Sequence, residues 1–417
     1  MSGRIFYLES FLIKAERHFI EVSLAIHNLL QKSHIENFIF VGNKQLNTEV
    51  AKLLPGIVPG ITQTVFENLE DYGESLFQDL KDLDSKYDFQ PDDLLIIPTA
   101  YENQILGVTK FVNDKGGQVP EIAIQFHIIL PPVKDSDDWM DNKFQEYWFN
   151  RIKQAFHQLP NSVSIWTTES ENLNSDYGKL AGRKLGTLPV PFLVMESDKK
   201  INKDPKQTLV GFLGEGRQEK GLSLLLGAIK VINQKKNNFQ FVIQNNNPRG
   251  YSEKDMKIFL SLMSEVKKFK NVTIIEGGIA PVPYHKLLLT LDAVIMPHNP
   301  ANYIRRVSGL LIQGSMYNIP CIVSSGTEEQ LSIERGDTKG QIFPYDVKSR
   351  ENTVRNLVES LQYFAAHKME ILKEKLPSIE KLKRHNSALG YFERLLAAYP
   401  NSSILSEIVH KGKRHEK

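Results

Sequence analysis

The chain has 417 residues, and because domains usually contain about 100–200 residues, this length predicts two or three domains, with two favoured. With 41% hydrophobic and 24% charged residues, the composition is that of a soluble globular protein, which excludes wholesale disorder. No apolar run approaches the ~18–20 residues of a membrane span, and charges between Met1 and His18 interrupt any signal-peptide core. The single cysteine, Cys321, excludes a disulfide framework and a cysteine zinc site. We therefore expect a protein of a reducing compartment, the cytoplasm.

The formal net charge of +2 conceals an uneven distribution. Residues 1–200 carry a net charge of −9, whereas residues 201–417 carry +11. Opposite signs in the two halves indicate two domains with different roles, although drift of solvated surface charge would give the same split.

In the first half of the chain, apolar runs of strand length alternate with stretches of helical periodicity. The expected strands are 4–8, 37–41, 93–97, 121–126 and 162–167. The expected helices are 15–31, 69–87, 103–113 and 143–159. This alternation predicts a mostly parallel sheet with helices on both faces.

A proline-rich and charged stretch, 186–206, interrupts the pattern and is typical of an interdomain linker. A second series follows, with strands expected at 208–213, 239–244, 272–276, 293–296 and 320–324 and helices at 222–233, 252–269, 284–291 and 309–317. The last ~70 residues also have helical character. The sequence therefore predicts an α/β protein of two doubly wound, Rossmann-like domains whose facing strand ends form a ligand cleft.

The most informative segment is the glycine loop that follows the first strand of the second series. Gly214 and Gly216 are followed by Arg217 and Lys220, and a helix is expected to begin near Glu219. Small residues let backbone amides approach a ligand, and a helix N-terminus with two cations suits a diphosphate. A dinucleotide fingerprint is not met, because Glu219 stands where its third glycine would be, and no Walker sequence occurs. Taken alone, the loop is equally compatible with an ordinary glycine turn bearing surface charges.

A second segment, 292–323, has the pattern of strand, loop, helix and strand. Ser308 and Gly309 fall at the expected helix start, so their amides form a second anion cradle. Gln313 lies four residues after Gly309 and therefore on the same side of that helix.

The order of these motifs resembles that of a known family. An Arg-x-x-Lys-Gly loop precedes an Asp-x-x-x-x-Pro strand end, a Ser-Gly helix start and an Asn-x-Pro turn into a strand. This order resembles the C-terminal domain of GT-B glycosyltransferases, especially the retaining family 4 enzymes, which use nucleotide-sugar donors. The resemblance covers 205–345 well, whereas 1–200 matches loosely, through the strand that ends at His127 and through 167–191.

The resemblance implies a GT-B fold with an N-terminal acceptor domain, 1–190, a C-terminal donor domain, 205–384, and helices in 385–417 that cross back to the first domain. It also implies roles for single residues. The donor diphosphate would be bound by Arg217 and Lys220, and Gly214 and Gly216 would let the backbone approach it closely. Other donor groups would be bound by Arg306, Ser308 and Gly309, and Gln313 would face the ribose. Gly277 would lie near the base, and His127 would lie near the sugar and the leaving phosphate.

This chain departs from the family at two acids. Family members usually carry two glutamates eight positions apart, and here Arg305 and Gln313 occupy those positions. Arg305 leaves the identity of the sugar open and favours an anionic one, unless Arg306 points inward instead. The run Tyr303-x-x-Arg306-x-Ser308-Gly309 resembles a divergent branch of these transferases that is still catalytic.

Other candidate residues have structural alternatives. His18, at the start of a helix, is a candidate for acceptor contact, but a solvated helix-start histidine is the favoured interpretation. His127 ends a buried strand, a place that suits a cleft residue, with a hydrogen-bonded core histidine as the alternative. The acidic pairs 92–93 and 137–138 fit loop or cap roles, and no cluster has metal-ligand spacing. The basic residues from Lys368 onwards could contact anionic lipid, although solvated charge is the default.

We therefore expect a cytoplasmic glycosyltransferase that moves a sugar from a nucleotide-diphosphate sugar to a glycan, lipid-linked or protein acceptor. The resemblance implies retaining, metal-independent transfer without a cofactor. The rival hypothesis is a non-catalytic GT-B subunit that binds a partner, and an epimerase is a weaker third. Nucleic-acid binding is not expected, because aromatic residues are not interleaved with the basic ones. Peripheral contact with the inner membrane face and homo- or hetero-oligomers remain compatible with the sequence.

Overall fold

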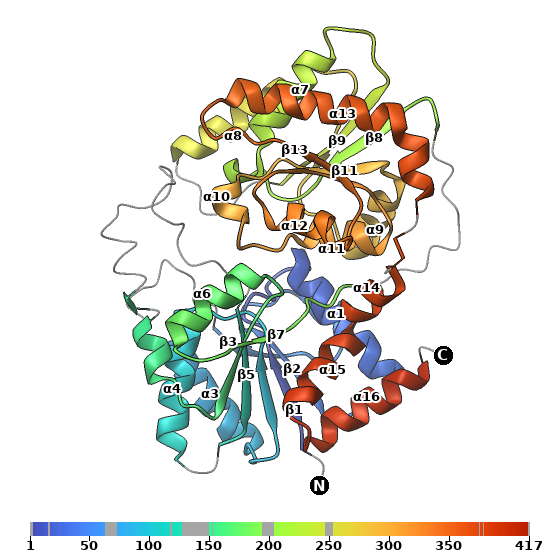
Figure 1. The fold of residues 1–417 in the computed structure, drawn as a ribbon. Coiled ribbons are helices and arrows are strands. Elements are labelled where there is room, and N and C mark those ends of the chain that lie inside the picture. Colours follow the sequence, from blue (N-terminus) through green and yellow to red (C-terminus); the bar gives the residue numbers. More distant parts are fainter. Residues whose placement is uncertain are drawn as a thin grey trace. The chain divides into compact units, whose positions relative to one another are not determined.

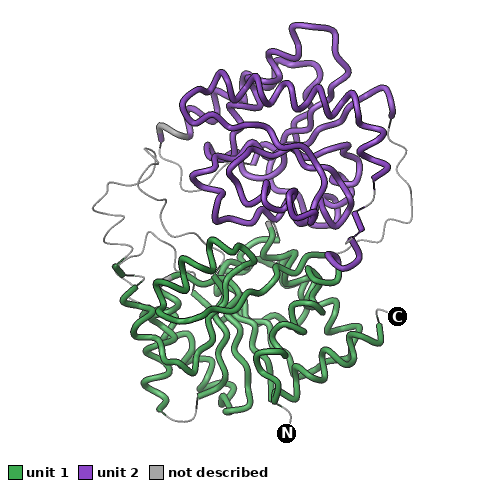
Figure 2. The backbone as a smooth tube through the Cα atoms, viewed as in Figure 1, with its two compact units in different colours: residues 1–193, 384–417 green, residues 194–383 purple. Residues whose placement is uncertain are grey.

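The computed structural model describes residues 3–15, 17–62, 73–116, 119–126, 150–151, 153–193, 204–246, 253–374, 376–377 and 379–415. The chain divides into two compact units (Figure 2). Unit 1 comprises Met1–Leu193 and Arg384–Lys417, and unit 2 comprises Val194–Lys383.

Unit 1 contains a seven-stranded sheet of order β3-β2-β1-β4-β5-β6-β7, in which each neighbouring pair of strands is parallel (Figure 1). Its strands are β1 (Ile5–Leu8), β2 (Phe38–Asn43), β3 (Val58–Ile61), β4 (Leu94–Ile97), β5 (Glu121–Phe126), β6 (Val163–Thr167) and β7 (Gly186–Thr187). Its helices are α1 (Arg17–Lys32), α2 (Thr48–Leu53), α3 (Glu74–Tyr87), α4 (Glu102–Lys115), α6 (Glu171–Ala181), α15 (Ala388–Ala398) and α16 (Ser403–His415).

Unit 2 contains a six-stranded parallel sheet of order β10-β9-β8-β11-β12-β13. Its strands are β8 (Thr208–Phe212), β9 (Phe239–Asn245), β10 (Val272–Glu276), β11 (Ala293–Met296), β12 (Cys321–Ser324) and β13 (Gly340–Phe343). Its helices are the short η1 (Gln218–Lys220), α7 (Leu222–Ile232), α8 (Glu253–Val266), α9 (Pro281–Thr290), α10 (Pro300–Tyr303), α11 (Gly309–Met316), α12 (Glu328–Glu334) and α13 (Arg350–Lys373), and α14 (Ile379–His385) includes the boundary between the two units.

Both sheets reverse their strand order at the equivalent place. In unit 1 the chain runs outward from β1 to β2 and β3, then returns to the other side of β1 with β4. In unit 2 it runs from β8 to β9 and β10, then returns to the other side of β8 with β11. Such switch points open a crevice at the carboxyl ends of the two central strands, where doubly wound folds bind ligands.

The central strands are apolar because both sheet faces are covered. Successive residues of β1 enter opposite cores: Phe6 and Leu8 pack with α3 and α4, whereas Ile5 and Tyr7 pack with α1, α15 and α16. Period-two alternation therefore disappears from the sequence of these strands, as is usual for buried parallel sheets.

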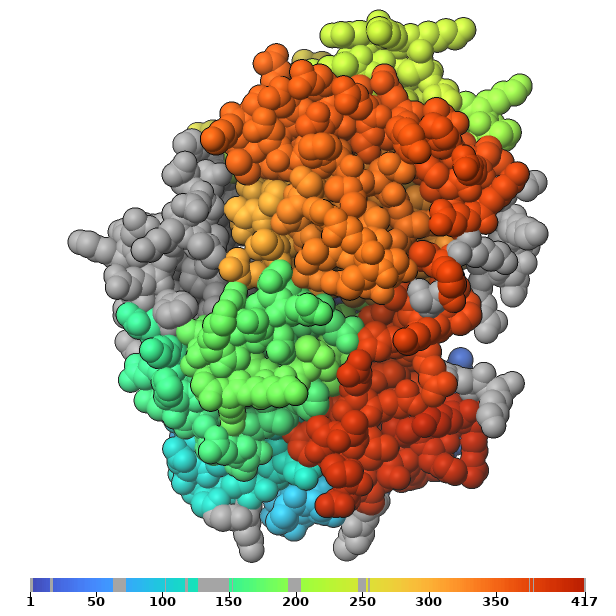
Figure 3. Space-filling model, in the orientation of Figure 1, coloured from blue at the N-terminus to red at the C-terminus, as the bar shows by residue number. Residues whose placement is uncertain are grey.

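The C-terminal helices α15 and α16 complete unit 1. Their fully buried side chains, including Tyr391, Phe392 and Ile404, share a core with Ile26 of α1. The hydroxyl groups of Tyr399, at the end of α15, and Ser164 of β6 form a hydrogen bond, which connects α15 to the half of the sheet that contains β6. On the face shown in Figure 3, these red C-terminal residues and the green residues before 193 form one continuous surface of unit 1.

The predicted doubly wound α/β class with two sheets is confirmed, and most predicted strands agree with the structure within two residues. Two predictions were wrong. Residues 186–193 belong to unit 1 rather than to a linker, because β7 pairs with β6 and the Phe192 amide donates to Asn386 O at 3.0 Å. Lys368 is not part of a basic surface, because it is 2% exposed and its Nζ lies 3.3 Å from Asp292 Oδ2.

Candidate functional site

The candidate site lies at the switch point of unit 2, between the loops that follow β8 and β11. A hydrogen bond of 2.8 Å from the Asn299 amide to Glu219 O joins the two loops. Gly221, between η1 and α7, has a φ of 76°, and a Cβ there would lie 2.0 Å from Pro297 O. The close approach of the two loops therefore depends on a glycine at this position.

Arginines from both loops meet at one carboxylate. Arg217 Nη1 lies 3.1 Å from Glu219 Oε1, and Arg306 Nη1 lies 3.7 Å from the same oxygen. Arg217 Nε also lies 3.5 Å from Glu215 Oε2. The structure thus brings together Arg217 and Arg306, which are 89 positions apart in the sequence.

The Lys220 side chain lies against the turn that contains Gly214, because a Cβ added to Gly214 would lie 2.8 Å from Lys220 Nζ. Burial, followed by repulsion from Arg217, lowers the pKa of Lys220 to about 8, although Glu215 and Glu219 act in the opposite direction. Glu215 and Glu219 offset two of the three positive charges of Arg217, Lys220 and Arg306, so one excess positive charge remains to attract an added anion. The arrangement can therefore bind a phosphate or diphosphate.

A buried polar trio supports the loop after β11. His298 Nδ1 lies 2.9 Å from Glu329 Oε1, and the imidazole stacks on the Tyr303 ring at a centroid distance of 3.8 Å. Burial lowers the pKa of His298, while Glu329 partly opposes this effect. The Arg306 guanidinium lies 5.4 Å from the centre of the Tyr303 ring. The sequence interpretation missed His298 and Glu329, since 31 positions separate them; a histidine directly after an apolar strand and its proline was the available signal.

Helix α11 begins in the same loop. Ser308 is its N-cap, with extended backbone and no side-chain capping bond, and Gly309 is its first residue. Both are half-buried. Gln313 is 5% exposed, one turn further along. These positions agree with the predicted helix start, and their proposed contacts with a donor remain predictions.

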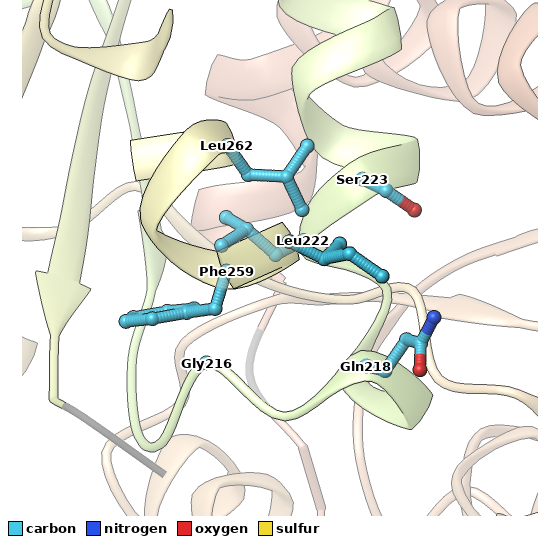
Figure 4. Close-up of a pocket in the computed structure, with 7 residues that line it drawn as sticks. Gly216, Gln218, Leu222, Ser223, Phe259 and Leu262 are labelled. Carbon is cyan, nitrogen blue, oxygen red and sulfur yellow. The ribbon is translucent and has the colours of Figure 1, made fainter. Parts of the chain in front are cut away.

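The glycines of the β8 loop differ in what they allow. Gly216 is buried, and a Cβ there would lie 2.1 Å from Cε2 of Phe259, so its missing side chain makes room for α8. Beside it lies a cavity of about 20 Å³ lined mainly by apolar side chains (Figure 4). Its lining residues are Gly216, Gln218, Leu222, Ser223, Ile258, Phe259 and Leu262. This volume holds about one water molecule, so the cavity is a packing feature rather than a ligand pocket.

Gln244 connects the loops after β8 and β10. It accepts a hydrogen bond from the Gly214 amide at 2.8 Å and donates one to Gly277 O at 2.9 Å. Gly277 has a φ of 78°, and the space where a Cβ would lie is open. The predicted diphosphate and base loops are therefore neighbours at one sheet edge.

Two predicted site residues belong to unit 1. His127 lies outside the described residues. His18 is exposed in the first turn of α1, with its ring 3.9 Å from the Phe19 ring centre. Of the two acidic pairs, Asp93 has a structural role, because its carboxylate binds the Arg4 guanidinium at 2.5 Å. The pair 137–138 is outside the described residues.

Across the part of the chain that the structure describes, no group of three or more His, Cys, Asp or Glu side chains is placed to hold a metal ion. Within those same described ranges, every helix is too short or too polar to cross a lipid bilayer.

Comparisons with known proteins bear on the fold. No family model matches the chain, and no curated protein matches it. Among solved structures, it is similar to sucrose-phosphate synthase from Thermosynechococcus elongatus, with a TM-score of 0.63 and 14% identity over 95% of this chain and 100% of that one. The chain has the GT-B glycosyltransferase fold.

Two further GT-B structures carry ligands. One is an α,α-trehalose-phosphate synthase (UDP-forming) from Burkholderia xenovorans in complex with glucose-6-phosphate, with a TM-score of 0.62 and 11% identity over 95% of this chain and 99% of that one. The other is HepE from Anabaena in complex with UDP, with a TM-score of 0.59 and 10% identity over 95% of this chain and 100% of that one. The similarity at these identities concerns the GT-B fold, and the reaction is a separate inference.

Proposed function

We propose that this GT-B protein is a glycosyltransferase that binds a nucleotide-diphosphate sugar at unit 2 and transfers the sugar to an acceptor hydroxyl. The observation that carries the proposal is the gathering of Arg217, Lys220 and Arg306 at the switch point of the unit 2 sheet. The UDP bound to the similar HepE structure supports a nucleotide ligand.

The residues of this cluster suit the chemistry of a departing diphosphate. When the bond between sugar and phosphate breaks, negative charge develops on the nucleotide diphosphate. Lys220 supplies a point charge and Arg217 a planar fork, and the amides of Ser308 and Gly309 at the start of α11 can donate hydrogen bonds to a phosphate group. Gln313 can donate or accept a hydrogen bond at the donor ribose. Retention of anomeric configuration and independence from metal are part of this proposal, on the basis of the family resemblance.

The rival function is a non-catalytic GT-B subunit. The observation in its favour is that Arg305 and Gln313 stand where family members usually carry glutamates. Such a protein would bind a nucleotide or a partner without turnover.

A donor-panel assay separates the two functions. Release of nucleoside diphosphate is measured with UDP-glucose, UDP-galactose, UDP-N-acetylglucosamine, UDP-glucuronate, GDP-mannose and dTDP-rhamnose. We expect turnover of at least one donor and a loss of about 10²-fold or more in Lys220→Ala. Lys230→Ala, which changes an exposed lysine of α7 paired with Glu265, is the matched control and should keep full activity. Silence with every donor, together with intact diphosphate binding, would favour the non-catalytic function.

A further inference from the structure

The loop after β11 carries a buried histidine–carboxylate pair to which the proposed function assigns no role. His298 is 4% exposed, and Glu329, in the first turn of α12, is 1% exposed. His298 Nδ1 lies 2.9 Å from Glu329 Oε1, and the imidazole stacks on Tyr303. The Ser324 hydroxyl donates a hydrogen bond to the backbone oxygen of His298. The position of the imidazole is therefore fixed by its carboxylate partner, by a stacked ring and by the main chain.

The Glu329 carboxylate is only partly satisfied by this contact. Its Oε2 atom is buried, and among the residues that the structure describes it has no hydrogen-bond partner. A buried charge is costly unless it is paired, and a buried oxygen without a partner adds to that cost. A glutamine at this position could accept a hydrogen bond from His298 without carrying a charge. A carboxylate is the better choice in a state of the protein in which His298 is positively charged.

The other charged groups that act on His298 are cations. Burial lowers the pKa of His298, Glu329 opposes this effect through its charge and the hydrogen bond, and Lys220 and Arg217 lower the pKa further. Tyr303 adds no charge beside the ring, because burial raises its pKa. Since an ordinary histidine has a pKa of about 6.5, a histidine with a lowered pKa is neutral at pH 7.

The three cations of the candidate site are balanced by three carboxylates when Glu329 is included. The cations are Arg217, Lys220 and Arg306, and the carboxylates are Glu215, Glu219 and Glu329. A diphosphate bound at the cations brings negative charge that opposes their effect on His298, while Glu329 continues to attract a proton to the ring. Protonation of His298 then gives the site one excess positive charge, which is matched to the anion.

We infer that His298 takes up a proton from solvent when a diphosphate binds at Arg217 and Lys220, and that Glu329 balances the charge of the resulting imidazolium. The proton adds to a ring nitrogen of the neutral imidazole, whose charge changes from 0 to +1, and no other bond changes. The pair strengthens the binding of the anion through its charge and does not need to touch the reacting sugar. The inference rests on the proposed function for the identity of the anion, whereas the proton uptake can be measured with any diphosphate.

A consequence of this coupling is that two groups make anion binding depend on pH in separate ranges. His298 acts near pH 7, and Lys220, with its pKa of about 8, acts above it. At pH 7 Lys220 already holds most of its proton and can take up only about 0.1 proton when the anion binds. Proton uptake at pH 7 beyond this amount therefore reports on His298.

Calorimetric titration of the full chain at pH 7 measures this proton uptake. Inorganic pyrophosphate, UDP, GDP, ADP and CDP are each titrated in PIPES, HEPES and imidazole buffers, whose protonation enthalpies differ. The dependence of the binding enthalpy on the buffer gives the number of protons taken up. We expect the wild type to take up about 0.5 proton more per bound anion than His298→Asn, which keeps an N–H donor for Glu329 but cannot be protonated. The titration of the anion itself is the same for both proteins and cancels in the difference.

Two further variants separate this function from a purely structural role of the pair. Glu329→Gln keeps a hydrogen-bond acceptor and removes the negative charge, so we expect it to lose about half of the extra proton uptake or more and to bind the anion about threefold more weakly. A purely structural pair would show unchanged proton uptake in this variant. His367→Asn removes an exposed histidine of α13 that stacks on Tyr363 and should keep the uptake of the wild type. Thermal unfolding confirms that each variant is folded.

The two probes distinguish failure of the inference from failure of the proposed function. Equal proton uptake in the wild type and His298→Asn, or an uptake of no more than about 0.1 proton by the wild type, would overturn the inference even if a nucleotide binds. Pyrophosphate binding with uptake that depends on His298, in the absence of binding by every nucleotide, would count against the proposed function and support the inference. Absence of binding by pyrophosphate and by all nucleotides would overturn both.

Discussion

Lys220 is the cation of the candidate site whose pKa is lowered. Its pKa of about 8 places the loss of its charge within the range in which enzymes are assayed. Arg217 is charged throughout this range, since a guanidinium keeps its proton below about pH 12. The affinity of the site for an anion should therefore follow the protonation of Lys220.

We predict that nucleoside diphosphate affinity falls about tenfold between pH 7.5 and pH 9, because the neutral amine loses its attraction for phosphate as pH rises through about 8. In Lys220→Arg the affinity should change far less over the same interval, since arginine stays charged. Calorimetric titrations of both proteins across this range provide the measurement. Parallel pH profiles for the two proteins would contradict the assignment of Lys220 to the site.

A second pH-dependent prediction concerns the effect of Glu9 on the free energy of unfolding of unit 1. Burial raises the pKa of Glu9 from 4.5 to about 7 in the folded protein, so the folded state holds this proton more tightly than the unfolded state. Protonation of Glu9 therefore contributes to the stability of the folded state in full below about pH 4.5, and this contribution is lost as pH rises through about 7. Relative to the wild type, Glu9→Gln should gain about 3 kcal/mol in the free energy of unfolding of unit 1 between pH 4.5 and pH 8.

Urea unfolding at the two pH values measures this difference when it is followed by tryptophan fluorescence, because all three tryptophans of the chain lie within residues 1–193 of unit 1. A constant gap between wild type and Glu9→Gln would show that the carboxyl group titrates normally.

Among the structural elements, the turn that contains η1 determines the geometry of the cation cluster. Gly221 ends this turn with a left-handed backbone conformation and touches the loop after β11 at Pro297. Any side chain at this position must push the β11 loop away, and Arg306 lies on that loop.

We predict that Gly221→Ala destabilises unit 2 by about 3 kcal/mol, from backbone strain together with the clash against Pro297 O. It should also weaken diphosphate binding, because Arg217 and Arg306 move apart. Gly336→Ala is the matched control: its φ is 75° but the space around it is open, so strain alone should cost about 1 kcal/mol. Equal losses in the two variants, by thermal unfolding and calorimetry, would show that the loops are not held together at Gly221.

The elements that the sequence predicted well are those with a strong local pattern. Four-residue apolar runs such as Ala293–Met296 mark buried parallel strands without reference to the rest of the fold. The three edge strands that were not predicted lack this pattern: Gly340–Phe343 is mostly half-buried, Gly186–Thr187 has two residues, and Val58–Ile61 contains a proline and a glycine. Their pairing is decided by neighbouring strands, which a single sequence does not reveal.

The residues of the candidate site also divide into those that a local pattern predicts and those that only the fold brings together. Arg217 and Lys220 could be predicted because they share one loop with its glycines, and Ser308 because it precedes a helix. His298 and Glu329 meet only through the order of the strands.

At the scale of the whole molecule, the chain returns to unit 1 at its C-terminal end, and the folding of unit 1 depends on these last residues. Tyr391, Phe392, Ile404 and Leu405 are at most 1% exposed within the core that β1 and α1 share. Burying four such side chains contributes about 6–12 kcal/mol, which is comparable to the whole stability of a domain.

We predict that deleting residues 386–417 prevents unit 1 from folding, whereas unit 2 keeps its own core and its diphosphate site. Limited proteolysis should then yield one resistant fragment that corresponds to unit 2. Deleting only 413–417, whose Lys413 pairs at the surface with Glu393, is the control and should leave both units resistant. Two resistant units in the longer deletion would contradict the dependence on α15 and α16.

Calorimetric titration of the full chain with UDP, GDP, ADP, CDP and dTDP tests whether the cations of unit 2 form a nucleotide-diphosphate site. We predict that at least one of these diphosphates binds, that its affinity falls tenfold or more in Arg217→Ala and in Lys220→Ala, and that Lys230→Ala keeps it. Unchanged affinity in both site variants, or no binding of any diphosphate to the wild type, would contradict this prediction.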